Sequence, residues 1–444
     1  MTTKKILLAL WVCVCSAFPT ILNAATYYVA PNGNDTYNGS KGSPFATVQR
    51  AQEAVEPGDT VYMRGGTYLM PADKIAAYEL RDTYACVTHL TKSGTPEKRI
   101  YYFAYPDEKP KFDFSQVKPS GKRVSGFWVN GDWLHFKGIE VTGIQQTITD
   151  RNAQSECFSN SGSHNIYELL EMHDGMGIGF FSREGGNNLI LNCDAWRNYD
   201  PVCDAAGGRN GGNVDGFGSH YSKPGDGPNI FRGCRAWYNS DDGFDFIKNG
   251  EVSIIENCWA FYNGYSYEGA DDAFHSRGDG NGFKAGGYAR NPRISELPVP
   301  IPRNMVRFSL AVRNKSKGFD SNYHADGILW YNNTAYNNNH NFHMETAGKV
   351  SADDTTLTFI PGRNHFMFNN LSYKGRTTNL TRIVETACVM VNNNFDIDKA
   401  LTDADFVSFD ETQLTAPRKS DGSLPDINFM KMAGGDAFGM HSKP

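Results

Sequence analysis

Hydrophobic and polar positions in the middle of the chain follow a repeating frame that lacks the spacing of an amphipathic helix. The segments LNCDAWRN, RGCRAWYN, ENCWAFYN, FSLAVRN and NNTAYNN share this frame when they are aligned on their last asparagine. An alanine stands three positions before the asparagine each time, and a third column lies five positions before it. The columns are Asn198, Asn239, Asn263, Asn314 and Asn338; Ala195, Ala236, Ala260, Ala311 and Ala335; and Cys193, Cys234, Cys258, Ser309 and Asn333.

The repeats are unevenly spaced, with long insertions at fixed places between them. This is typical of a solenoid whose loops grow on one side. Each repeat is rich in β-branched, aromatic and small residues, which favours strands. We therefore predict an all-β fold, a right-handed parallel β-helix in which each repeat adds one coil and the insertions rise beside a groove. The asparagine column is expected to be structural, an internal ladder that closes a turn.

The two ends of the chain depart from the repeat. Residues 1–25 carry Lys4 and Lys5, an apolar run and a small-residue exit at LNAA, the pattern of a secretory signal peptide. This predicts a secreted, periplasmic or cell-surface protein without a membrane span, in which residues 26–444 form one β-helix catalytic domain. A short helix before Pro57 is expected to cap the first coil, because an exposed sheet edge invites aggregation. Residues from about 400 to 444 lose the columns and are expected to pack on the solenoid as a helical or looped tail.

The net charge bears on what the protein can bind, and the cysteine column bears on how the core is packed. The chain has a net charge of −6, and loss of the two signal-peptide lysines makes it more acidic, so we expect no nucleic-acid partner. If the substrate is a polyanion, something other than net charge must link it to this acidic protein. The cysteine column is interpreted as buried small apolar residues, with a disulfide between stacked neighbours as the alternative.

The frame also predicts which residues of neighbouring coils meet. Equivalent residues of stacked coils lie about 4.8 Å apart. Gly-Phe pairs recur at 216–217, 243–244, 282–283 and 318–319. This alignment places Asp215 over Asp242 and Lys284 beside Asp245. The two columns are three positions apart, so a bend at the glycine is needed for both to face one groove.

These side chains suggest a metal site with a base beside it. Asp215, Asp241, Asp242 and Asp245 offer the clustered oxygens that suit Ca²⁺, although a solvated acidic turn is the alternative. Lys284 is either a salt-bridge partner or a general base, since a nearby divalent cation would lower its pKa toward the working range. Calcium with such a base matches β-elimination on a uronic acid, in which the base removes the C5 proton and the C4 oxygen departs.

The segments YYVAPNGND, NVDGFG, NSDDGFDF, GNGFKAGG, KGFDSN and RKSDGSLPD give the chain a recognisable identity. Along nearly its whole mature length it resembles the ninth family of polysaccharide lyases, calcium-dependent pectin-cleaving β-helix enzymes. The resemblance implies that the four aspartates bind catalytic Ca²⁺ and that Lys284 is the base. It implies an acidic plant polysaccharide as substrate, with rhamnogalacturonan I favoured and polygalacturonate as the alternative. We expect a monomer.

Other functions remain open at this stage. A pectin hydrolase would use paired carboxylates, but the Gly-His-Gly and Arg-Ile-Lys segments of polygalacturonases are absent. A non-catalytic glycan-binding solenoid would use the aspartates for structural calcium. Further substrate contacts, each with a structural alternative, are expected from residues on later coils. They are Lys317, Asp320, Asn322 and His343.

Overall fold

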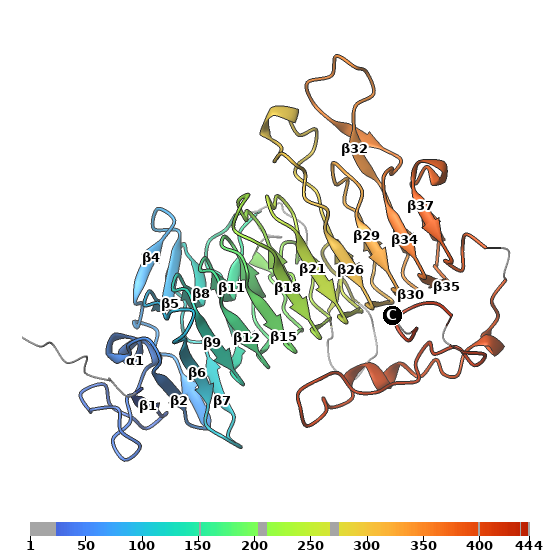
Figure 1. The fold of residues 1–444 in the computed structure, drawn as a ribbon. Coiled ribbons are helices and arrows are strands. Elements are labelled where there is room, and N and C mark those ends of the chain that lie inside the picture. The colour runs from blue at the N-terminus through green and yellow to red at the C-terminus, as the bar shows by residue number, and fades with distance from the viewer. Residues whose placement is uncertain are drawn as a thin grey trace, which may run out of the picture.

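The computed structural model describes residues 24–150, 152–202, 211–266, 275–397, 400–435 and 437–442. Three long sheets run side by side through the molecule, and successive strands of each sheet come from successive coils of the chain (Figure 1). All strand pairs in these sheets are parallel except β4 with β5. The fold is therefore the predicted parallel β-helix. The predicted signal peptide lies almost wholly outside the described residues.

The strands of the three sheets follow in spatial order. The first sheet contains β1 (Thr26–Val29), β2 (Thr60–Met63), β6 (Ile100–Ala104), β9 (Leu134–Lys137), β12 (Ile166–Glu168), β15 (Leu189–Leu191), β18 (Asn229–Arg232), β21 (Ser253–Glu256), β26 (Met305–Arg307), β29 (Leu329–Tyr331), β34 (Phe366–Phe368) and β37 (Val389–Val391). The second contains β3 (Gly66–Leu69), β7 (Pro110–Asp113), β10 (Glu140–Thr142), β13 (Glu171–His173), β16 (Asp194–Trp196), β19 (Arg235–Trp237), β22 (Trp259–Phe261), β27 (Leu310–Val312), β30 (Thr334–Tyr336) and β35 (Leu371–Tyr373). The third contains β4 (Ala77–Glu79), β5 (Tyr84–Leu90), β8 (Arg123–Val129), β11 (Ser155–Asn160), β14 (Gly177–Ser182), β17 (Phe217–Ser219), β20 (Phe244–Asp245), β25 (Phe283–Lys284), β28 (Lys317–Asp320), β31 (His340–His343) and β36 (Thr378–Thr381).

The predicted columns are the actual register of the second sheet. Ala195 pairs with Ala236, which pairs with Ala260, and the run continues through Ala311 and Ala335. The cysteines of the neighbouring column are fully buried, and all six cysteines in the described part of the chain are free. Stacked thiols therefore serve here as small apolar core groups.

Buried asparagines tie the coils together beside the alanines. The amide nitrogen of each asparagine donates to the side-chain oxygen of its counterpart on the next coil, at 2.9–3.2 Å. The ladder runs through Asn198, Asn239, Asn263, Asn314 and Asn338. Each of these amides is fully buried, so the hydrogen bonds replace those lost to water.

Aromatic rings fill the interior behind the third sheet. Phe217, Phe244, Phe283, Phe319 and Phe342 stack face to face with centroids 4.8–5.0 Å apart. Each ring comes from the same position of its coil, which fixes the register of the strands that carry the candidate site.

A helix covers the first coil, and the tail of the chain packs along one side of the solenoid. Helix α1 (Val48–Ala54) begins at Thr47, whose hydroxyl accepts the Arg50 N–H, and buries Val48 and Ala51 over the first coil. The predicted helical cap is confirmed. The tail after residue 400 packs Leu414, Phe429 and neighbouring side chains against the outer face of the second sheet.

The remaining elements lie in the insertions and the tail. They are β23 (Tyr265–Ser266), β24 (His275–Ser276), β32 (Thr346–Gly348) and β33 (Thr358–Ile360), with the 3₁₀ turns η2 (Ile294–Glu296), η3 (Glu385–Ala387), η4 (Asp403–Asp405) and η5 (Glu411–Thr415). Within the described ranges, no helix combines the length and hydrophobicity needed to span a bilayer.

Candidate active site

The chain bends at the glycine that precedes each strand of the candidate site. Gly216, Gly243 and Gly282 are all bend residues. A Cβ on Gly243 would lie 2.8 Å from Asn263 Nδ2 in the interior, so the glycine faces inward, as the following phenylalanine does. Two consecutive inward positions break the alternation of the strand. The residue before the glycine and the residue after the phenylalanine can then both lie on the outer face. This is the consequence of the bend that the sequence predicted at the glycine.

Three aspartates converge at this face. The backbone N–H of Asp242 donates to Asp215 Oδ1 at 3.0 Å, so the two residues stack on neighbouring coils as predicted. One ligand oxygen from each of Asp215, Asp241 and Asp242 lies within 4.8 Å of the others. Asp242 Oδ1 is held in place by the backbone and side-chain N–H groups of Asn281, at 2.7 and 2.8 Å.

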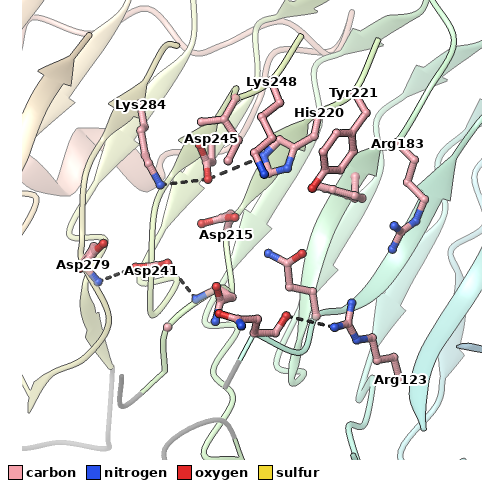
Figure 2. Close-up of a pocket in the computed structure, with 16 residues that line it drawn as sticks. Arg123, Arg183, Asp215, His220, Tyr221, Asp241, Asp245, Lys248, Asp279 and Lys284 are labelled. Atoms are coloured by element: carbon pink, nitrogen blue, oxygen red, sulfur yellow. Dashed lines mark hydrogen bonds and ion pairs between the residues drawn. The ribbon is translucent and has the colours of Figure 1, made fainter. Parts of the chain in front are cut away.

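Lys284 lies against the same cluster. Its Nζ is 3.1 Å from Asp245 Oδ2 and 3.2 Å from Asp242 Oδ2. Asp245 is the register neighbour of Lys284, and His220 Nε2 approaches the same Asp245 oxygen at 3.7 Å (Figure 2). Asp245 is therefore the partner of Lys284 and His220, and it stands outside the group of three converging oxygens.

Four buried carboxylates lie around one lysine, and this excess of negative charge shifts the pKa values of the site. Burial and the other three carboxylates raise the pKa of Asp215 well above its usual range. Burial, with the charges of Asp241 and Asp245, raises the pKa of Asp242 to about 7 despite Lys284. Burial lowers the pKa of Lys284, but the carboxylates outweigh it and leave the pKa well above its ordinary value. Burial also opposes ionisation of Asp245, yet Lys284 and His220 hold its pKa low.

The donor set fits a hard cation. Asp245 Oδ1 is a buried oxygen without a hydrogen-bond partner in the described part of the chain, and the buried Asp242 Oδ2 has only its ion pair with Lys284. Buried polar atoms in native proteins are normally satisfied, so such oxygens indicate a missing partner. Calcium prefers several carboxylate oxygens in irregular geometry. Asp215, Asp241 and Asp242 would hold the ion, with Asp245 beside them.

The cluster lies at one end of a pocket that also contains residues that the sequence did not reveal. Besides Asp215, Asp241, Asp245 and Lys284, its lining includes two arginines from earlier coils, and a tyrosine and a lysine from the coils of Asp215 and Asp245 (Figure 2). These are Arg123, Arg183, Tyr221 and Lys248. A signal for Arg183 was present, because Gly179-Phe180 pairs in register with Gly216-Phe217 and extends the Gly-Phe column one coil upstream.

The four predicted substrate contacts gather on later coils. Lys317 Nζ and His343 Nδ1 lie 2.8 and 3.0 Å from the two oxygens of Asp320. The backbone N–H of Asn322 donates to Asp320 Oδ1. Asp320 is the register neighbour of Lys284, but this cluster is not part of the pocket lining. A role in substrate binding stays a prediction for these four residues.

Comparison with known proteins agrees with this geometry. Residues 27–358 match the family model described as Pel9A-like, right handed beta helix region. Pectate lyase L of Dickeya dadantii is 35% identical over 412 residues, which span 92% of this chain and 83% of that protein. Pectate lyase PEL9 of Emericella nidulans is 27% identical and is aligned over 97% of both chains.

Two solved structures are similar in fold and sequence. A rhamnogalacturonan lyase superposes with a TM-score of 0.87 at 41% identity and covers 94% of this chain and 100% of its own. Pectate lyase Pel9A gives a TM-score of 0.68 at 33% identity, over 93% of this chain and 90% of its own. The chain therefore belongs to the Pel9A-like right-handed β-helix family and is a polysaccharide lyase of the ninth family.

Proposed function

We propose that this protein is a secreted, calcium-assisted lyase that cleaves a galacturonate-containing pectin backbone by β-elimination. The observation that carries the proposal is the position of Lys284 Nζ, 3.1 and 3.2 Å from Asp245 and Asp242 at the edge of three converging carboxylates. Residues 26–444 act as the catalytic β-helix domain after removal of residues 1–25.

In this proposal Lys284 acts as the base. The neutral amine takes the C5 proton of the uronate, and the C5–H electron pair forms the C4=C5 double bond. The C4–O bond breaks as a result, and the leaving oxygen takes a proton from solvent. Asp215, Asp241 and Asp242 would hold calcium, whose positive charge would bind the sugar carboxylate, favour the neutral lysine and stabilise the developing enolate-like charge. Asp245 orients the amine from the neighbouring strand.

Rhamnogalacturonan I is the proposed polymer, with polygalacturonate as the alternative. The rhamnogalacturonan lyase structure matches this chain with the higher identity and TM-score of the two solved relatives. Curated relatives of lower identity carry the name pectate lyase, which keeps polygalacturonate in the test.

The test is an assay of wild type and Lys284→Ala on both polymers, with calcium and with a chelator. Elimination produces an unsaturated uronate whose ultraviolet absorbance grows with time. Hydrolysis produces reducing ends without that absorbance, and a glycan-binding solenoid produces neither. We expect the wild type to generate the absorbance only with calcium, and the variant to be at least about 100-fold slower. A fully active variant would refute the assignment of the base.

A further inference from the structure

Arg183 lines the same pocket as Lys284 but comes from an earlier coil. It directly follows β14, whose Ser182 pairs with Ser219 of β17, so Arg183 stands beside His220 on the next coil. The strands β14, β17, β20 and β25 are successive neighbours in the sheet. Arg183 and Lys284 are thus three coil spacings apart, roughly 14 Å along the solenoid axis. A polysaccharide lying along the pocket would pass both residues.

The Arg183 guanidinium is held rigidly against the Tyr84, Trp128 and Phe181 rings, and its side chain remains 13% exposed. Its Nε donates to Ser159 Oγ at 3.0 Å, and its Nη2 donates to the Tyr84 hydroxyl and to the buried Glu156 carboxylate. No hydrogen bond in the described part of the chain uses Nη1, and this atom is not among the buried unsatisfied ones. Nη1 is therefore the donor that remains for a ligand in the pocket that Arg183 lines. An arginine fixed in this way is pre-organised to receive an anion.

The charge balance at this end of the pocket is positive. Arg123 also lines the pocket, and it donates to the Tyr84 hydroxyl at 2.9 Å and to Asn152 O at 3.1 Å. The buried Glu156 carboxylate pairs directly with Arg183 and is linked to Arg123 only through the Tyr84 hydroxyl, which donates to it at 3.0 Å. The aspartate cluster lies at the opposite end. The arginine end is suited to a carboxylate of the substrate without any metal ion.

An aromatic surface lies in the pocket on the Arg183 side of His220. Tyr221 is 45% exposed although it lines the pocket. Figure 2 shows the ring on the side of His220 that faces Arg183. Such a ring offers a flat face to an uncharged part of a sugar chain.

We propose that Arg183 binds the carboxylate of a second uronate, distant from the cleaved bond on the same polysaccharide, while the intervening sugar lies on Tyr221. This inference rests on the proposed function and deepens it. The subsite would select polymers in which uronates recur along the chain at the spacing between the two ends of the pocket. Arg123 supports the subsite by adding charge.

The experiment measures binding by calorimetry in an inactive Lys284→Ala background, so that catalysis does not interfere. The probes are oligosaccharides of increasing length prepared from the polymer that the wild-type enzyme cleaves. The test variant is Arg183→Met combined with Glu156→Gln, because methionine alone would leave a buried carboxylate unpaired. Glu156→Gln alone and Arg197→Met, a surface arginine paired with Asp174, are the matched controls.

We expect the double variant to bind long oligosaccharides at least about tenfold more weakly and short ones as tightly as the parent does. Arg197→Met should keep the parental affinity at every length, and Glu156→Gln alone, which keeps the Arg183 charge, should weaken the binding of long probes much less than the double variant does. Arg183→Lys keeps a charge opposite Glu156, so it folds if the double variant does not. Arg183→Lys should also bind long oligosaccharides more weakly than the parent and short ones equally well, but its loss of affinity should be smaller than that of the double variant. Tyr221→Ala should likewise weaken the binding of the long probes.

Two results would overturn the inference while leaving the proposed function intact. One is unchanged affinity for long probes, and the other is an equal loss at every length, which would place Arg183 at the cleavage site itself. Failure of the wild type to cleave either polymer would instead refute the proposed function and this inference with it.

Discussion

Lys284 Nζ lies 3.1 Å from Asp245 Oδ2, and the two residues are register neighbours on adjacent strands. This contact has two opposing effects on a base. It fixes the direction of the amine, and the negative charge of Asp245 is the largest of the charges that raise the pKa of Lys284. A lysine must lose its proton before it can act as a base. Asp245 therefore orients the amine and also raises the pH at which the amine becomes neutral.

Asp245→Asn separates these two effects. Removal of the negative charge lowers the pKa of the Lys284 ammonium, so the activity should rise with pH at lower pH values than in the wild type. The maximal rate should fall, because the neutral amide holds the amine less firmly and offers the cation less charge. The measurement is the pH profile of kcat at saturating calcium. A profile that keeps its position while the rate falls would show that Asp245 does not set the protonation of Lys284.

Metal removal should affect stability as well as activity. Asp215, Asp241 and Asp242 repel one another in a buried cluster, and a bound cation would relieve that repulsion. We therefore expect calcium to raise the unfolding temperature of the wild type relative to a chelator. Asp242→Asn should reduce this calcium effect, yet it should unfold at or above the wild-type temperature in chelator because one buried charge is gone. The measurement is thermal unfolding followed by circular dichroism.

The control for that experiment is an acidic residue outside the site. Asp403→Asn changes an exposed carboxylate that pairs with Lys374 near the tail. It should leave the calcium effect unchanged. Loss of the effect in this variant too would mean that calcium acts elsewhere on the molecule.

The register of the central coils could be predicted because three columns constrain it at once. A slip of one residue would move Ala236 and Asn239 out of the interior, so only one pairing of the coils satisfies the pattern. The stacking of Asp215 with Asp242 and of Asp245 with Lys284 follows from that register. The sequence therefore contained the position of the site on the fold.

The upstream half of the pocket was harder to predict for a physical reason. The position of Ala195 is taken by Met172 and Val141 on the earlier coils, where larger side chains fill the interior and the columns fade. Arg183 and Arg123 were reachable only through the Gly-Phe column, which continues upstream through Gly179-Phe180 to Gly126-Phe127 of β8, and each arginine lies three residues outside the pair. The repeating pattern also could not predict the directions of the side chains. Register alone could not show that Asp245 turns to Lys284 and His220 rather than joining the other three carboxylates.

The asparagine ladder should account for a measurable part of the folding free energy. Asn263 donates to Ala236 O and to Asn314 Oδ1, and its own oxygen accepts two N–H groups of Asn239. Asn263→Ala would leave several of these buried groups unsatisfied, so we expect a loss of about 3 kcal/mol or more in the free energy of unfolding.

Urea unfolding at equilibrium measures this loss. The exposed Asn32→Ala serves as the control and should change stability by less than about 0.5 kcal/mol. Similar values for the two variants would show that the ladder contributes no more than a surface amide does.

His365 should make the fold sensitive to mild acid. Its Nδ1 accepts the Ile328 N–H at 3.0 Å inside the last coils, which requires that nitrogen to be unprotonated. Burial lowers the pKa of His365 to about 4, whereas an unfolded histidine titrates near 6.5. As the pH falls from about 6.5 to about 4, His365 becomes protonated in the unfolded chain but stays neutral in the folded chain. The contribution of His365 to stability is therefore lost over this window, by up to about 3 kcal/mol at 1.36 kcal/mol per pKa unit.

The pH dependence of His365→Asn tests this expectation. An asparagine oxygen can accept the Ile328 N–H without titrating, so the variant should lose less stability than the wild type on going from neutral pH to the lower end of the window. Its stability at neutral pH should be somewhat lower, because the smaller side chain leaves a cavity. Part of the slope should persist, since burial also lowers the pKa of His324. Urea titrations in chelator at several pH values give the two slopes, and identical slopes would rule out His365 as the acid-sensitive group.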